Sequence, residues 1–469
     1  MSLITAQRPM RYSKRSLITF SGLTIPITMA ELPFLLFLPA FYTQEIGLGV
    51  GLVGAVFLAV KLWDGISDPV IGWLSDRSKS RYGRRKPMVI MGAPLLMISL
   101  WNLCNPGDSA TLTYLTIWAI LFYTAHTLVK IPYFAWAAEL STDYKERNRV
   151  TAFRDGALMV GNLLAVAAPL FFLAKATMIR DILFLLSSII VVLIPLMVLP
   201  LSVYIPDPKN TTPPKLGPVK GMLLLSKNRP LIGFIATCFL VCTALGAVSS
   251  VFIFFVNVRL NLPGAATFFI FVQYIVSISM IPIVVKLANR FEKHRVLASG
   301  MVVYCLSLVV LAVVPGGNYY LTAIGAALLG VGFTSVLILP YSITADIVDY
   351  DTAKHGEQRA GVYVAAVNFF IKVGYAAGLG IAYGFLHITG YDPSLAQQNL
   401  HASAILNITF CLIPVALTIP AIVLVWNFPI NKARQQQLRQ EIEHNNRAKD
   451  STKNYDINHY PLGKEDSHA

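Results

Sequence analysis

The chain has 469 residues, of which 55% are hydrophobic and only 13% are charged, and its formal net charge is +14. A water-soluble protein usually has about 25% charged residues, so this composition excludes an ordinary soluble globular protein. The composition instead predicts a protein that crosses a lipid bilayer many times.

Apolar segments long enough to cross a membrane recur along the whole chain. A helix rises about 1.5 Å per residue, so about 20 residues span the roughly 30 Å hydrocarbon core. The first segment is too long for the apolar part of a cleaved signal peptide and leads directly into the second. The sequence predicts an all-α membrane protein with twelve transmembrane helices, near residues 17–43, 49–75, 87–105, 111–139, 150–174, 180–204, 230–258, 263–288, 295–316, 319–345, 360–388 and 402–428.

The distribution of Lys and Arg predicts the orientation of these helices. With a cytoplasmic N-terminus, 31 of the 38 basic residues fall in cytoplasmic segments, three fall outside and four lie within spans. Basic residues are enriched on the cytoplasmic side, so we expect both termini there, in a cell inner membrane. This excess explains the positive net charge, and we expect no nucleic-acid partner.

A hydrophilic stretch divides the predicted spans into two groups of six. We therefore predict an N-terminal six-helix bundle, a cytoplasmic linker, a C-terminal six-helix bundle and a cytoplasmic tail, at residues 1–204, 205–229, 230–428 and 429–469.

The two halves resemble each other in sequence. The pair Pro132-Tyr133 lies near the end of the fourth span, and a charged loop follows that span. The pair Pro340-Tyr341 lies at the corresponding place in the tenth span, which is also followed by a charged loop. A parallel repeat of six spans is the plan of the major facilitator superfamily, in which binding sites lie near mid-membrane between the halves. This repeat predicts two pseudo-symmetric bundles with a site between them.

Eight ionisable side chains lie inside segments that otherwise read as lipid-spanning, away from the ends of these segments. A charge at membrane depth costs about 2.5–3.5 kcal/mol, so such groups face the protein interior and usually pair with each other. Their balance predicts a polar site at membrane depth, which is typical of a transporter. Four are basic and four acidic: Lys61, Lys130, Arg154, Lys372, Glu31, Asp64, Asp68 and Asp155.

Lys61, Asp64 and Asp68 share one face of the second span, because they are spaced three and seven residues apart. Two carboxylates one helical turn apart in an apolar interior repel each other unless a proton or a small cation joins them. We predict that Asp64 and Asp68 bind a coupling cation, Na⁺ or H⁺, with the Ser67 hydroxyl as a further oxygen ligand. The alternative is a purely structural pairing of the two acids with the nearby lysines: Lys61, Lys130 or Lys372.

Three segments carry a specific sequence pattern. The first, residues 61–93, reads KLWDGISDPVIGWLSDRSKSRYGRRKPMVIMGA, and the pattern continues in residues 130–154 and 345–376. Together they resemble the family of glycoside–pentoside–hexuronide:cation symporters. The resemblance implies a secondary active transporter that couples a Na⁺ or H⁺ gradient to transport of a sugar-like or other small organic solute. It also implies a monomer with no cofactor beyond the coupling ion.

The resemblance implies roles for individual residues. Asp64, Asp68 and Thr127 fall on the cation ligands of the family, and Lys372 on the lysine that links the ion and solute sites. The expected substrate site contains Arg154, which falls on the family's substrate arginine, and Asn368.

Three positions depart from the galactoside transporters of that family. Thr28 and Lys130 stand where those transporters have sugar-binding aspartates, and Phe134 replaces a stacking tryptophan. The loss of both acids argues against a galactoside, while Glu31, one turn from Thr28, supplies a carboxylate nearby. The alternative is a cation-coupled transporter of an anionic or amphiphilic, lysolipid-like substrate. In that case we expect Lys130 to pair with the second-span acids when the site is empty and with the solute when it is loaded.

A second group of charges lies at the expected cytoplasmic ends of helices. We predict that they form a gate whose contacts break during alternating access: Arg84, Arg85, Glu139, Arg149 and Asp346. The sequence has no evident nucleophile–base set or metal-ligand cluster, so we do not expect an enzyme. A receptor or scaffold on the same fold would not need balanced internal charges, which favours transport.

Overall fold

The computed structural model describes residues 12–78, 80, 83–107, 110–140, 144–173, 178–207, 228–355, 360–392, 400–438 and 440. Within these residues every regular element is a helix, and twelve stretches are long and apolar enough to cross a membrane. The prediction of an all-α protein with twelve spans is therefore confirmed.

The N-terminal half begins with a broken span. It consists of α1 (Lys14–Gly22), α2 (Thr24–Leu32), the π-helical turn η1 (Pro33–Phe37) and α3 (Leu38–Gln44). The half continues with α4 (Val50–Arg77), α5 (Lys86–Cys104), α6 (Leu112–Glu139), α7 (Tyr144–Phe172) and α8 (Ile179–Tyr204).

The C-terminal half begins with α10 (Arg229–Phe254), which continues into the π-helical turn η2 (Phe255–Arg259). It continues with α11 (Ala266–Arg290), α12 (Lys293–Val313), α13 (Tyr319–His355) and α14 (Ala360–Ile388). The last span combines α15 (Leu400–Asn407), the π-helical turn η3 (Ile408–Leu412) and α16 (Ile413–Trp426).

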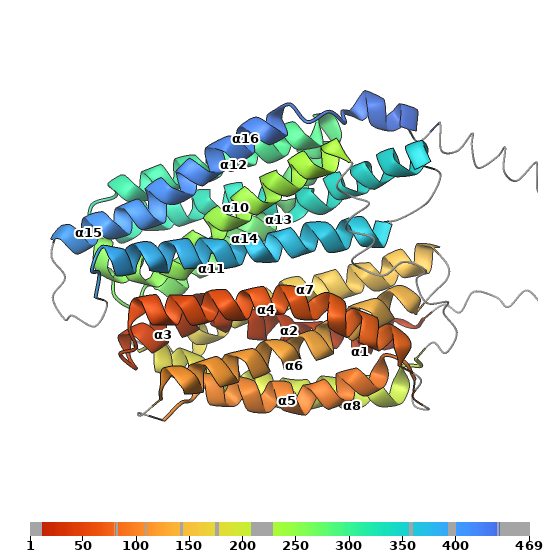
Figure 1. Ribbon diagram of the computed structural model, residues 1–469, viewed down its shortest axis with the longest axis horizontal. Coiled ribbons are helices and arrows are strands. Elements are labelled where there is room, and N and C mark those ends of the chain that lie inside the picture. The colour runs from red at the N-terminus through yellow and green to blue at the C-terminus, as the bar shows by residue number, and fades with distance from the viewer. Residues whose placement is uncertain are drawn as a thin grey trace, which may run out of the picture.

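The two halves lie side by side, with the N-terminal helices in the lower part of Figure 1 and the C-terminal helices in the upper part. Across the boundary, α4 packs along α14 and α7 along α11. Most of the predicted linker 205–229 lies outside the described residues, as does the tail beyond residue 440. The limits predicted for the two bundles, the linker and the tail stay a prediction.

The break in the first span has a local cause. Pro33 has no N–H to donate to the preceding turn, and its ring crowds that turn, so a regular helix is interrupted there. The chain makes the wider turn η1 at this point and then resumes as α3. Glu31 stands two residues before Pro33, so this acid lies next to the irregular backbone.

Close packing between the halves depends on a glycine of α4. A Cβ added to Gly54 would lie 2.4 Å from the Cβ of Tyr383 on α14, which no real side chain tolerates. The missing side chain therefore lets α4 approach α14 closely. The ionisable face of α4, which contains Lys61, Asp64 and Asp68, begins two turns after this glycine.

The tenth span is longer than predicted. We expected it to end near residue 345, whereas α13 continues to His355. Residues 346–355 are mostly polar, so an apolar pattern ends before them, but they contain no Gly or Pro to stop the helix.

Candidate functional site

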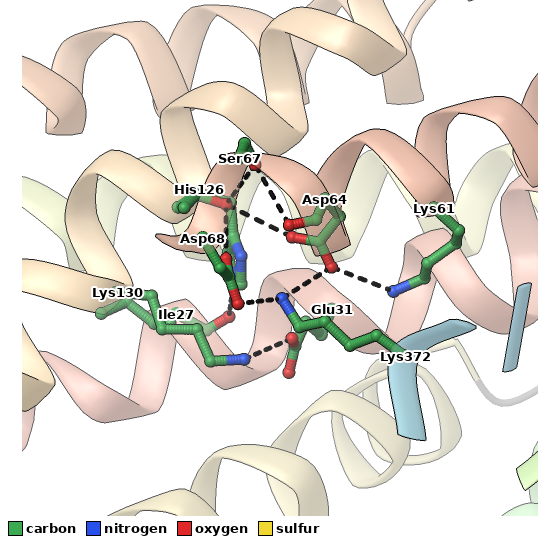
Figure 2. Close-up of polar contacts among 10 residues, drawn as sticks. Ile27, Glu31, Lys61, Asp64, Ser67, Asp68, His126, Lys130 and Lys372 are labelled. Carbon is green, nitrogen blue, oxygen red and sulfur yellow. Dashed lines mark hydrogen bonds and ion pairs between the residues drawn. The ribbon is translucent and has the colours of Figure 1, made fainter. Parts of the chain in front are cut away.

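Asp64 and Asp68 on α4 share one ammonium group from the other half of the molecule. The Nζ of Lys372 on α14 lies 2.9 Å from Asp64 Oδ2 and 2.6 Å from Asp68 Oδ2. Figure 2 shows this lysine reaching between the two carboxylates. Two like charges one turn apart are thereby bridged by a cation that belongs to the protein.

Two hydroxyl groups complete the oxygen cluster. Thr127 on α6 places its Oγ1 at 3.3 Å from Asp64 Oδ1 and 3.2 Å from Asp68 Oδ1. The Ser67 hydroxyl lies 3.4 Å from Thr127 Oγ1 and 3.1 Å from the Asp64 carbonyl oxygen, to which it donates. The predicted cation ligands therefore lie together, and carboxylate and hydroxyl oxygens are the ligands that hard cations prefer.

Exposure differs between the two acids. The Asp64 side chain is 2% exposed, whereas the Asp68 side chain is 22% exposed. Asp68 is therefore the carboxylate that an ion or water reaches first, and Asp64 is enclosed behind it.

Lys61 is a second cation beside Asp64. Its ammonium lies 4.0 Å from Asp64 Oδ2 and 4.5 Å from the centre of the Tyr123 ring. The aromatic face offers partial stabilisation to a buried ammonium, in addition to the carboxylate. Lys61 thus contributes charge to the cluster at a longer distance than Lys372.

Lys130 pairs with Glu31 rather than with the acids of α4. Its Nζ lies 2.5 Å from Glu31 Oε1 on α2 (Figure 2). The predicted pairing of Lys130 with the second-span acids is therefore wrong, because Lys372 already occupies the position between them. Glu31 instead neutralises the lysine that replaces an aspartate of the galactoside transporters.

The other predicted substrate residues lie on several helices. The Arg154 guanidinium is 2.8 Å from Asp155 Oδ1 and stacks on the Phe134 ring, with 4.6 Å to the ring centre. Asn368 on α14 is half-buried. Thr28 is buried and donates its hydroxyl to the Thr24 carbonyl at 2.8 Å, so this hydroxyl is engaged within its own helix.

A group of charges also forms where α4, α5 and α6 meet. Glu139 at the end of α6 accepts hydrogen bonds from Arg84 and from Arg85, the latter at 2.7 Å. Arg85 also lies 2.5 Å from Asp76. Burial alone would lower the pKa of the Arg85 guanidinium, but the hydrogen bond and charge of Glu139, together with Asp76, raise it above its ordinary value.

Asp207 anchors this group and was not predicted. Its Oδ2 accepts the backbone N–H groups of Arg85 at 2.7 Å and Lys86 at 2.9 Å, which are the N-cap and the first residue of α5. A carboxylate at a helix N-terminus satisfies free donors and the helix dipole. The sequence offered no signal for this contact, because Asp207 is 121 residues from Lys86.

The corresponding acid of the C-terminal half uses different partners. Asp346 on α13 accepts from Lys293 at 2.7 Å and from Gln435 of the segment after α16. Arg149 instead donates to the Tyr12 carbonyl at 3.0 Å and pairs with Glu146 at 3.2 Å. Among the contacts of the described residues, Arg84 and Arg85 meet Glu139, whereas Arg149 and Asp346 have other partners. The predicted gate stays a prediction. Lys293 is 53 residues from Asp346 in the chain, so the sequence gave no signal for this contact.

Comparison with known proteins identifies the family. Residues 20–432 match the family model described as MFS/sugar transport protein. The chain belongs to this family. It is a multi-pass membrane protein of a family of transporters, so the predicted resemblance and the predicted secondary transport function are confirmed.

Two curated relatives show the range of the family. The chain is 25% identical to the putative glycoside/cation symporter YagG of Escherichia coli (strain K12), with 86% of this chain and 89% of the relative covered. It is 21% identical to sodium-dependent lysophosphatidylcholine symporter 1-B of Danio rerio, with 84% of each covered.

The fold also has solved counterparts. The crystal structure of the nucleoside transporter NupG superposes with a TM-score of 0.64 at 12% identity, covering 88% of this chain and 99% of that one. At this identity the likeness concerns the fold alone.

Proposed function

We propose that this protein is a sodium-coupled symporter that carries a small organic solute across a cell inner membrane, with both termini in the cytoplasm. The observation that carries the proposal is the bridge from Lys372 on α14 to both Asp64 and Asp68 on α4. It joins the two halves of the molecule through a site suited to a cation. The excess of Lys and Arg in the predicted cytoplasmic segments supports the orientation.

The oxygen set favours Na⁺ as the coupling ion. The carboxylates of Asp64 and Asp68 and the hydroxyls of Thr127 and Ser67 come from two helices of one half. A proton needs only one acceptor, whereas a hard metal cation is held by several oxygens at once. One relative, the lysophosphatidylcholine symporter, is sodium-dependent by name.

Coupling follows from competition at this site. A Na⁺ ion that binds between Asp64 and Asp68 takes the place of the Lys372 ammonium. The freed ammonium then becomes available to the solute, and the link between α4 and α14 changes. If Na⁺ raises the affinity for the solute by some factor, the solute raises the affinity for Na⁺ by the same factor.

The solute site is proposed beside the ion site. Arg154, Phe134, Lys130, Glu31 and Asn368 would contact the solute, with Lys372 shared between the two sites. We further propose that the transporter works as a monomer, with no cofactor beyond the coupling ion.

A lysolipid-like solute is the alternative to a sugar-like one. The specific observation is the Arg154 guanidinium stacked on Phe134, which places a positive charge next to an aromatic surface. Such a pair suits a molecule with an acidic head and an apolar part. The lysophosphatidylcholine relative shows that the family includes carriers of amphiphiles.

A stability screen tests the proposed function. The purified full-length protein is heated with a set of sugars, glycosides, organic acids and lysolipids, once in NaCl and once in choline chloride. A ligand that binds the native state raises the melting temperature. The proposal predicts that at least one solute raises the melting temperature more in NaCl than in choline chloride. If every stabilising solute raised the melting temperature equally in both salts, the proposal would be contradicted.

A further inference from the structure

The charges around the ion site balance before any ion binds. Figure 2 draws six ionisable side chains here, the Lys130–Glu31 pair and the cluster of Lys61, Lys372, Asp64 and Asp68. These three lysines and three acids together form the charge network. Arg154 and Asp155 form a second, separate neutral pair nearby. The described side chains of this region therefore carry no net charge.

The six groups act on each other beyond their direct contacts. Lys130 is close enough to Asp64 and Asp68 to interact with both electrostatically, although its direct partner is Glu31. Lys61 interacts with Glu31 as well as with Asp64. His126, which faces the same groups, donates its Nε2 hydrogen to the Ile27 carbonyl at 3.3 Å, a bond that a neutral imidazole makes. A charge added at one end of the network is therefore felt at the other.

One bound Na⁺ would leave this network with an excess charge of +1. An uncompensated charge in a protein interior at membrane depth is strongly unfavourable. A negative charge brought by the solute removes the excess. We propose that the solute is an organic monoanion, and that one Na⁺ and one monoanion cross together, so that transport is electroneutral. This inference rests on the proposed symport function and defines the chemical class of its solute.

The acidic group of the solute is received by Lys372. Na⁺ displaces this ammonium from Asp64 and Asp68, and the lysine then lacks a counter-charge. Lys130 differs, because Glu31 at 2.5 Å already neutralises it. The solute anion thus pairs with the Lys372 ammonium that Na⁺ has displaced. Each ligand alone leaves an unbalanced charge, and both together leave none, which is a physical cause for coupling.

Two single variants change the network charge without touching a Na⁺ ligand, and their combination leaves it unchanged. Lys130→Gln makes the network more negative by one charge, Glu31→Gln makes it more positive by one, and the double variant restores neutrality. At about 10 Å in a protein interior, one unit charge changes the binding constant of another roughly tenfold. Isothermal titration of NaCl into each purified full-length variant, at constant ionic strength, measures the effect.

The proposal predicts a specific order of Na⁺ affinities. Lys130→Gln should bind Na⁺ roughly tenfold more tightly than the unmodified protein, Glu31→Gln roughly tenfold more weakly, and the double variant within about threefold. Equal affinities in all four proteins would overturn the proposal, because Na⁺ would then respond only to its direct ligands. If one single variant fails to fold, the other single variant and the double variant still decide.

Matched solutes test the charge of the substrate directly. Each pair differs only in one acidic group, for example methyl β-glucuronide against methyl β-glucoside. In proteoliposomes with a Na⁺ gradient, saturable uptake of an anionic member, unchanged by an imposed membrane potential, supports the proposal. Saturable uptake of a neutral member, or uptake driven by the potential, overturns it. If neither member of any pair is taken up, the Na⁺ affinities of the unmodified protein and its three variants decide.

Na⁺ binding to the unmodified protein and to the variants separates the monoanion inference from the symport proposal. If the unmodified protein does not bind Na⁺, the symport proposal itself is wrong. If it binds Na⁺, and the substitutions at residues 31 and 130 leave the Na⁺ affinity unchanged, only the monoanion inference is wrong.

Discussion

The Lys372 ammonium lies 2.6 Å from the Asp68 carboxylate, although the two residues stand 304 positions apart in the chain. The contact joins α14 of one half to α4 of the other, at the face where these helices pack. A lysine in this position is a cation tethered to the protein, and a free cation must compete with it. In the proposed symport, the same contact would link ion binding to the arrangement of the two halves.

Removing this tethered cation should make the protein depend on Na⁺. We predict that Lys372→Gln binds Na⁺ more tightly, because its competitor is gone. Without Na⁺ it should lose about 1–3 kcal/mol of stability, below the value for a fully buried pair because the Lys372 side chain is 21% exposed. Melting curves at increasing NaCl check this, with Lys354→Gln, an exposed lysine at the end of α13, as the control. A variant that loses Na⁺ binding would show that Lys372 helps to hold the ion.

The Lys130–Glu31 pair should exclude galactosides. Thr28 and Lys130 replace the acids that would accept the sugar hydroxyls, and Glu31 is engaged with Lys130 at 2.5 Å. We predict that melibiose and lactose are neither transported nor raise the melting temperature, with or without Na⁺. Saturable uptake of either disaccharide into proteoliposomes would contradict this.

Gly83 should be intolerant of a side chain. Its φ of +115° is unfavourable for other residues, and a Cβ there would lie 2.2 Å from Asp207 Oδ2. We predict that Gly83→Ala lowers stability by about 1–3 kcal/mol. The control is Gly233→Ala in α10, where a Cβ meets no atom within 4 Å. Equal melting temperatures for the two variants would refute the close contact with Asp207.

Glu139 should stabilise the end of the molecule where α4, α5 and α6 meet. Glu139→Gln removes the negative charge that Arg84 and Arg85 share, and charge-assisted hydrogen bonds of this kind contribute about 1.5–3 kcal/mol. We predict a lower melting temperature than for Asp181→Asn, an exposed acid at the start of α8. An unchanged melting temperature would mean that the two arginines find other partners without loss.

The fold was predictable because hydrocarbon thickness fixes the length of each apolar span. The proximity of the two acids of the candidate ion site was also predictable, since the spacing of Asp64 and Asp68 places them on one helix face. The resemblance to known symporters added Thr127 and Lys372.

The partners of the charges were less predictable. The spacing along one helix does not show which residue of another helix reaches a carboxylate, so Lys130 was assigned to the wrong acids. Asp207 and Lys293 likewise contact residues distant in sequence. Such contacts depend on how helices pack, which local patterns do not encode.

Sodium titration of the unmodified protein and of Asp68→Asn tests the central claim most directly. The substitution removes one carboxylate charge with almost no change in volume, and Lys372 can still pair with Asp64. In calorimetry at constant ionic strength, with choline replacing sodium, we predict saturable binding of Na⁺ to the unmodified protein and its loss in Asp68→Asn. Saturable binding of equal affinity in both proteins would contradict a cation site at Asp64 and Asp68.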